Sequence, residues 1–150
     1  MAIKVSASPL QLKQIIFSKI EVEALIDNDN EFDADFDFDG ILITTEVMTA
    51  IKEGEEADPQ NFMVALKYEI PNEENQEKTA PYTIALEAQG WFELAPIYDI
   101  EKRKDIVTVN GASMIVGAMR EMVSQITGRS INGPMTLPSL RFVPSDDKSA

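Results

Sequence analysis

The sequence of 150 residues contains no cysteine and no histidine. Disulfides are therefore excluded, and so is every zinc site that needs thiolate or imidazole ligands. Serine–histidine and cysteine–histidine nucleophile systems are excluded for the same reason. Paired carboxylates are abundant, but a sequence this acidic contains such pairs by chance, and no catalytic set is visible. We therefore expect a protein that is not an enzyme and that uses no cofactor.

Basic residues are also scarce, since 13 lysines and arginines face 26 acidic residues and the formal charge is -13. This balance argues against binding to nucleic acid or anionic lipid, because both are polyanions. It fits solubility or a partner with a basic surface. Residues 1–6 lack the apolar core of a signal peptide, and no apolar run approaches the ~18 residues of a membrane helix. The expected location is the cytoplasm, without direct membrane insertion.

What is present is a series of segments that alternate between apolar and polar residues. Residues 20–24, 32–47, 62–70 and 82–94 show this period of two, which predicts four strands. Gly90 lies inside the fourth segment and predicts a bulge there. We expect one domain over residues 1–150, with 143–150 as a flexible tail.

After a charged connector at 101–105 the apolar period changes to three and four residues. Met114, Met119 and Met122 share this spacing, which predicts an amphipathic helix. Asn110 is the expected N-cap and Gly128 the expected stop. Gly133, Pro134 and Pro138 predict an extended segment over 131–142. Strands followed by a helix indicate an α+β fold, with a mostly antiparallel sheet of four strands and a long C-terminal helix.

Residues 35–46 match the calcium-loop pattern D-x-[DN]-x-[DN]-G-x5-E letter for letter. Such a loop must join two helices, whereas here one flank alternates and the other is β-branched. Ile43 also stands where a ligand or a water-binding group is expected. Period-two alternation explains the same aspartates as the solvent face of a strand, so we predict no metal site.

Methionines and aromatic residues are the candidates for a binding surface. Methionine is flexible and polarizable, and suits surfaces that accept many partners. Core packing is the alternative explanation and the commoner one for such residues. The residues that we expect to contact a bound peptide are Phe36, Phe38, Trp91, Phe92, Met114, Met119 and Leu137.

The C-terminal third resembles the SecB family of protein-export chaperones. Residues 117–129 are similar to the main SecB helix, with its Ala-Arg-Glu core, and 133–142 are similar to the proline- and leucine-rich stretch that follows it. Upstream, residues 19–24, 37–39 and 86–92 resemble three of the family's strands. Each motif is short, but their order and spacing agree over about residues 12–142.

The resemblance implies a homotetramer, built as a dimer of dimers, that holds unfolded polypeptide clients without ATP. It also implies SecA as a partner, docked on acidic residues of the sheet face that match Glu23 and Glu87 here. Lys19 replaces an acid of the family pattern, and Gly117 replaces its mid-helix proline. The chain stops soon after Phe142, without the family's terminal helix, which makes peptide holding a firmer expectation than delivery to SecA.

Three functional hypotheses follow. The first is a holdase chaperone that binds unfolded preproteins for export. The second is a dedicated chaperone or adaptor for one client, such as an antitoxin. The third is a calcium-binding regulatory protein, which depends on the loop pattern at 35–46.

Overall fold

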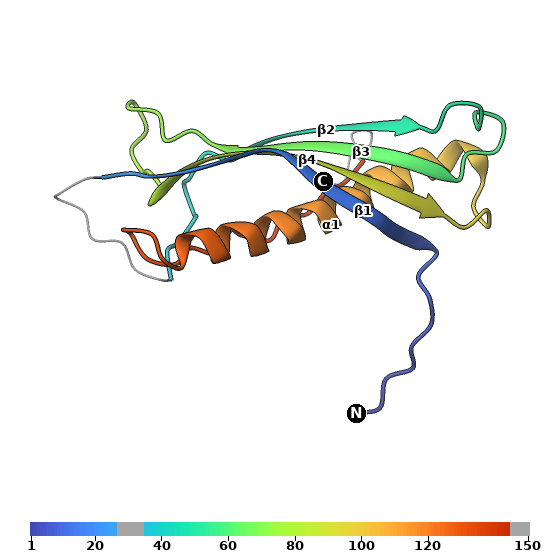
Figure 1. The fold of residues 1–150 in the computed structure, drawn as a ribbon, viewed down its shortest axis with the longest axis horizontal. Helices are drawn as coiled ribbons and strands as arrows, with labels where there is room; N and C mark the ends of the chain where they lie inside the picture. The colour runs from blue at the N-terminus through green and yellow to red at the C-terminus, as the bar shows by residue number, and fades with distance from the viewer. Residues whose placement is uncertain (27–34, 145–150) are drawn as a thin grey trace.

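The computed structural model describes residues 1–26 and 35–144. Within these residues the chain forms four strands followed by one long helix, which confirms the predicted α+β class (Figure 1). The elements in chain order are β1 (Leu10–Ala24), β2 (Thr44–Ile51), β3 (Asn61–Ile70), β4 (Tyr82–Leu94) and α1 (Ile100–Thr127).

The strands form an antiparallel sheet in the spatial order β1-β4-β3-β2. The central strands β3 and β4 bury every second residue, as a sheet with one covered face requires. β1 lies at one edge and changes register twice, between Leu12 and Gln14 and between Phe17 and Lys19. Such bulges interrupt regular pairing along an edge and so limit uncontrolled strand addition.

Helix α1 covers one face of the sheet (Figure 1). Its buried positions recur every three or four residues, the spacing of one helical face. They pack on the alternate residues of β3 and β4, and each large apolar side chain buried there contributes about 1.5–3 kcal/mol. The largest fully buried side chains are Tyr68, Tyr82, Phe92, Leu66, Ile70, Ile84, Leu86, Leu94, Ile115, Met119, Met135 and Leu137.

The predicted bulge at Gly90 is wrong, because Gly90 pairs regularly with Ile15 and Val64. The irregular pairing lies in β1 instead. A Cβ at Gly90 would come within 2.7 Å of Cε2 of Phe92. Glycine is therefore required at this position because the Phe92 ring lies against the strand backbone.

The predicted strand over 32–47 is also wrong in its first part. Residues 32–34 lie outside the described residues, 35–43 form a loop, and β2 begins at Thr44. Gly40 has a φ of 85°, and the Lys78 ammonium donates to the carbonyls of Asp37 at 2.6 Å and Asp39 at 2.7 Å. A glycine turn and a lysine from a distant loop thus hold this segment away from strand geometry.

The calcium-like pattern is therefore a loop that runs into strand β2. A strand follows it, so the helix–loop–helix arrangement on which the calcium hypothesis depends is not formed. In the described ranges, no three acidic side chains gather closely enough to hold a metal ion.

Helix α1 begins ten residues before the predicted N-cap. Asn110 is a mid-helix residue whose side-chain amide donates to the carbonyl of Ile106 at 2.8 Å, and Asp99 precedes the first turn. The charged residues 101–105 are the first turns of the helix and not a connector. The predicted end is confirmed, because Gly128 follows the last helical residue, Thr127.

Tyr68 on β3 carries a hydroxyl that is buried with no hydrogen-bond partner among the described residues. An unsatisfied buried hydroxyl is destabilising, so Tyr68→Phe should raise the free energy of unfolding by about 1 kcal/mol in urea denaturation. Tyr82→Phe is the matched control. The Tyr82 hydroxyl donates to the carbonyl of Gly133 at 2.6 Å, so its loss should lower stability by about 1 kcal/mol. Equal losses in both variants would contradict the prediction.

The dependence of the free energy of unfolding on pH above about 10 gives a second measurement. Burial raises the pKa of Tyr68 to about 12, from an ordinary value of about 10. A phenol whose folded pKa is raised contributes stability below its unfolded pKa, and that stability is lost as the pH rises from about 10 towards 12. As the pH rises over this range, the free energy of unfolding of Tyr68→Phe should therefore fall less than that of wild type.

Candidate functional site

The face of the sheet opposite α1 is covered by no element among the described residues and is the candidate binding surface. It will be called the open face. Its residues are the half-buried and exposed positions that alternate with the core residues along each strand. Because paired residues of an antiparallel sheet point to the same side, the register arranges the open face in rows across the four strands.

The rows of the open face nearest the start of β2 carry charged residues. One row runs Glu46, Lys67, Glu87 and Lys19 across all four strands, so that opposite charges alternate. The Lys67 ammonium lies 3.3 Å from the Glu87 carboxylate. The hydrogen bond that Lys67 donates to Glu87 raises the pKa of Lys67, and the charges of Glu87, Glu46 and Glu69 add to this effect. Lys67 therefore stays charged throughout the neutral range.

The next two rows are mostly apolar. One row runs Ala50, Met63, Trp91 and Gln14, and the other runs Met48, Ala65, Gln89 and Ile16. Met48 is 56% exposed and Ile16 is 45% exposed, although both are large apolar residues. The apolar patch is defined here as Ile16, Met48, Ala50, Met63, Ala65 and Trp91.

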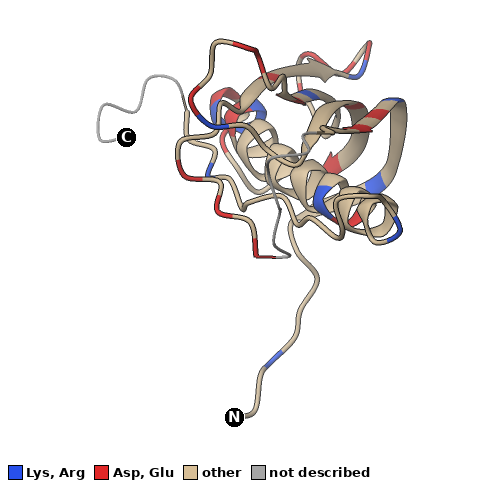
Figure 2. Cartoon of the chain, turned by 90° about the vertical axis from the view of Figure 1, so that its left-hand side faces the viewer, with Lys and Arg blue, Asp and Glu red and all other residues tan. Residues whose placement is uncertain are grey.

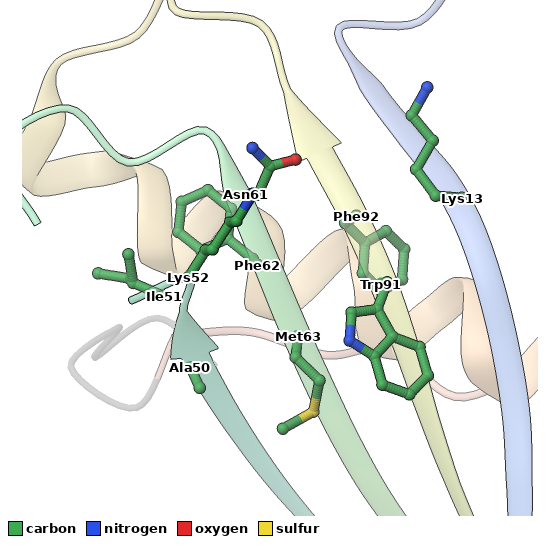
Figure 3. Close-up of a pocket in the computed structure, with 9 residues that line it drawn as sticks. All are labelled: Lys13, Ala50, Ile51, Lys52, Asn61, Phe62, Met63, Trp91 and Phe92. Atoms are coloured by element: carbon green, nitrogen blue, oxygen red, sulfur yellow. The ribbon is translucent and has the colours of Figure 1, made fainter. Parts of the chain in front are cut away.

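A cavity of about 410 Å³ opens at the row of the apolar patch that contains Ala50, Met63 and Trp91. Figure 3 shows Met63 and Trp91 on the neighbouring strands β3 and β4, with Lys13 on β1, the strand next to β4. Lys13 and Lys52 lie at its rim, and each is an exposed lysine paired with a glutamate, at 3.3 Å and 3.9 Å respectively. The cavity can take a bulky apolar side chain, and its rim can meet polar backbone groups of the same ligand.

Acidic residues lie on the loops as well as on the strands (Figure 2), and the sequence has 26 of them against 13 basic residues. No helix in the described part of the chain is long and apolar enough to cross a membrane.

The structure places the predicted site residues in four different settings. Trp91, Glu23 and Glu87 share the open face. Met114 lies exposed on α1. Phe92 of β4, Met119 of α1 and Leu137 of the segment after α1 are fully buried in the core, where they present no surface to a ligand.

Phe36 and Phe38 lie on the loop before β2 and are half-buried against the core. Their rings meet edge to face, with centroids 5.0 Å apart. The Lys78 ammonium lies 5.2 Å from the Phe36 ring centroid, a cation–π distance. These contacts make the pair part of the loop's own packing, apart from the apolar patch.

Sequence reasoning missed most of the apolar patch. Ile16, Met48 and Met63 were not singled out, and neither were the rim lysines Lys13 and Lys52. A signal was present in β3. Met63 and Ala65 alternate in step with Lys67 and Glu69, so they lie on the same face of the strand as these charged residues. Apolar residues on both parities indicate that both faces of the strand meet apolar surroundings.

The fold of this chain is SecB-like. One solved structure that it resembles is the Mycobacterium tuberculosis SecB-like chaperone Rv1957, in complex with a ChAD peptide from the Rv1956 HigA1 antitoxin. The TM-score is 0.52 at 17% identity, over 87% of this chain and 90% of that one. A Streptococcus agalactiae protein of unknown function gives a TM-score of 0.56 at 13% identity, over 91% of this chain and all of the other. No family model and no curated protein matches the sequence.

Proposed function

We propose that this protein is an ATP-independent holdase chaperone that binds unfolded polypeptides along the apolar patch. The carrying observation is that the open face bears two exposed large apolar residues, Ile16 and Met48, in the row next to a cavity lined by Met63 and Trp91, in a chain with a formal charge of -13. Exposed apolar residues grouped on one face beside a cavity are typical of an interaction site. Binding of this kind needs no catalytic group and no cofactor.

Methionine and small residues give the patch tolerance for different clients. Met48 and Met63 are flexible, and Ala50 and Ala65 leave room beside them. An extended client can place one bulky side chain in the cavity by Trp91 and lay its next residues over the second row. The proposed specificity is therefore for extended segments with bulky apolar residues, without a fixed sequence.

Two versions of the role differ in their clients. In one, the protein holds preproteins for export; in the other, it is dedicated to one client such as an antitoxin. The antitoxin peptide bound to the M. tuberculosis structure supports the dedicated version. Affinity capture separates the two, because a single dominant client favours the dedicated version and a broad set favours the export version.

The proposal also includes a cytoplasmic homotetramer, and SecA as a partner of the export version. Glu23 and Glu87 lie on the open face, as docking on the sheet face would need. Lys67 and Lys19 flank Glu87 in the same row, which reduces the attraction of this row for a basic partner. A solution mass of four chains would support the assembly, and a monomer would contradict it.

Trp91 is the single tryptophan of the chain and lies in the apolar patch, so it reports binding directly. An unfolded client without tryptophan should shift its emission to shorter wavelength as the indole loses water. The same protein should delay refolding of a slow-folding model client at equimolar ratio. Absence of both effects would overturn the proposed function.

A matched pair of variants locates the binding surface. Met48→Lys puts a charge in the apolar patch and should weaken client binding about tenfold or more, because the charge would be desolvated under the client. Thr44→Lys puts the same side chain four residues away, on the same strand and face but in the charged rows. It should leave client binding within about twofold of wild type. Equal effects of the two substitutions would remove the patch from the proposal.

A further inference from the structure

Residues 1–7 form an extended segment, called the arm here, that leaves the body of the molecule at the start of β1 (Figures 1 and 2). All seven residues are exposed. None makes a hydrogen bond or an ion pair with another residue in the ranges 1–26 and 35–144. No polar contact within the described chain therefore holds the arm in place.

The arm has the sequence pattern of a half-buried strand. Ile3 and Val5 alternate with Lys4 and Ser6, so in an extended chain the two β-branched residues point to one side and the polar residues to the other. Such a pattern predicts that the apolar side is covered. In the structure Ile3 is 74% exposed and Val5 is 91% exposed, so the described residues provide no cover for this side.

The arm starts from a fixed point at the edge of the open face. The Ser8 hydroxyl accepts from the Leu10 amide at 3.2 Å, and the Ser8 carbonyl accepts from the Gln11 side-chain amide at 2.9 Å. The Pro9 carbonyl accepts from the amide of Ala95, the residue that follows β4, at 2.9 Å. These bonds tie Ser8 and Pro9 to the sheet, so movement of the arm is a swing about Ser8.

The cavity beside Trp91 lies within reach of this swing. Lys13 lines the cavity and is five residues after Ser8, while Ile3 is five residues before it. An arm that folds back over the open face alongside β1 therefore brings Ile3 level with Lys13. Trp91 lies on the neighbouring strand, about 5 Å from β1, and the side chains of Ile3 and Trp91 can bridge that gap.

The charge of the arm favours this closure. Its side chains include one base, Lys4, and no acid, whereas the whole chain has a formal charge of -13. A basic segment is attracted to an acidic body over a distance of several ångströms. With Ile3 and Val5 turned to the sheet, Lys4 and Ser6 would remain in water on the outer side of the arm.

We propose that the arm closes over the cavity beside Trp91, with Ile3 in the cavity and Val5 at its rim, and that it competes there with the client. The inference rests on the proposed holdase function for the identity of that client. A short tether keeps the arm at an effective concentration in about the millimolar range, so a weak contact is enough for closure. Only segments that bind better than the arm displace it, so the arm sets a minimum apolar content for clients.

The emission of Trp91 tests closure in the full-length protein without a client. Ile3→Ser with Val5→Ser, called the arm variant, should stay open and emit at longer wavelength than wild type, because the indole gains water. Ala2→Ser with Lys4→Ser changes the other side of the arm and should emit as wild type does. Identical emission of the wild type and the arm variant would overturn the proposal.

A fluorescein-labelled peptide with the sequence Met-Ala-Ile-Lys-Val-Ser-Ala, which copies residues 1–7, tests the competition. Apparent affinity scales with the fraction of open molecules, so the arm variant should bind this peptide about tenfold more tightly than wild type. A peptide with serine at both β-branched positions should not bind. Equal affinity of wild type and the arm variant for the parent peptide would overturn the proposal.

Cross-linking identifies the chain that supplies the arm. The sequence has no cysteine, so Ile3→Cys with Met63→Cys introduces the only two thiols, one in the arm and one in the cavity wall. A short bismaleimide should join them within one chain, which runs as a single chain in denaturing electrophoresis. Products that consist mainly of two joined chains would mean that copies exchange their arms, and would overturn closure within one chain.

The closing arm and the holdase function fail separately. A client should shift the emission of Trp91 further in the arm variant than in wild type, because the arm covers the indole only in wild type. Responses of emission and peptide binding to the arm variant, with no delay of client refolding by either protein, would overturn the holdase function alone. An equal refolding delay by both proteins, with no difference in emission, would overturn the closing arm alone.

Discussion

Replacing Phe92 by alanine is expected to lower the free energy of unfolding by about 3–5 kcal/mol, the range for a large buried aromatic residue. Phe92 is 1% exposed and lies between the sheet and α1. Its ring fills the space above two glycines, Gly90 on its own strand and Gly111 on the helix. Neither glycine can move a side chain into the vacated space, so collapse of the cavity should be small. Urea denaturation with an unchanged m value would measure the loss.

A double-mutant cycle tests the reason for this loss. In the wild type, a Cβ at Gly111 would lie 3.1 Å from Cζ of Phe92 and 3.1 Å from Cγ2 of Val64. Overpacking of about 1–3 kcal/mol should exceed the helix propensity that alanine gains over glycine, about 1 kcal/mol. Gly111→Ala should therefore be destabilising in the wild type and less so with Phe92→Ala. An identical effect in both backgrounds would contradict the role of the ring.

Gly117 provides the control on the same helix. It is exposed, and a Cβ there would meet nothing within 4 Å. Gly117→Ala should raise stability by about 0.5–1 kcal/mol through helix propensity alone, whether or not Phe92 is present.

Replacing Arg103 by alanine is expected to lower the free energy of unfolding by about 2 kcal/mol. Arg103 is 5% exposed and ties the β2–β3 loop to the start of α1. It donates to the carbonyls of Tyr98 and Pro59 at 2.9 and 3.0 Å, and its guanidinium lies 2.7 Å from the Asp58 carboxylate. Its removal deprives these two carbonyls of their hydrogen-bond donor, and each lost hydrogen bond lowers the free energy of unfolding by about 1 kcal/mol.

The neighbouring lysine gives the matched control. Lys102 pairs with Asp99 at 3.6 Å, but both side chains are about two-thirds exposed, at 69% and 67%. Exposed pairs of this kind contribute little, so Lys102→Ala should change stability by less than about 0.5 kcal/mol. Comparable losses in the two variants would show that Arg103 acts only through its charge.

The dependence of the free energy of unfolding on pH below about 4 provides a further test of the role of Arg103. Its hydrogen bond holds the pKa of Asp58 below the ordinary value of about 3.9, with a smaller contribution from Gln60. A carboxyl group with a lowered folded pKa contributes stability above its unfolded pKa, and this is lost as the pH falls through the folded pKa. Below about pH 4, wild type should therefore lose more stability than Arg103→Ala. Parallel pH profiles would contradict the assignment.

Several elements could be read from local pattern. Residues 62–70 and 82–94 alternate strictly enough to predict β3 and β4 within a residue, because both strands bury one whole face. The stop of α1 at Gly128 followed from glycine's place at helix ends. The start of α1 did not, because exposed charged residues fit a first helical turn and a connector equally well.

The loop at 35–43 shows where alternation misleads. Phe36 and Phe38 alternate with aspartates, and both phenylalanines do turn towards the core. They do so from a loop, because Gly40 and the distant Lys78 fix its backbone. A contact between residues about 40 positions apart leaves no trace in a local period, so the pattern identified the inward side chains but not the conformation.

By itself the sequence determined an acidic α+β chain without thiol or imidazole chemistry, the order of four strands and one helix, and motifs spaced as in SecB, but not where β1, β2 and α1 begin. Only the tertiary structure decided which predicted residues are available to a ligand. Phe92 of β4, Met119 of α1 and Leu137 are buried in the core, whereas Trp91 faces the open side with Met48 and Met63. The physical reason is that a period of two shows that a strand has two faces, while the packing of a distant helix decides which one it covers.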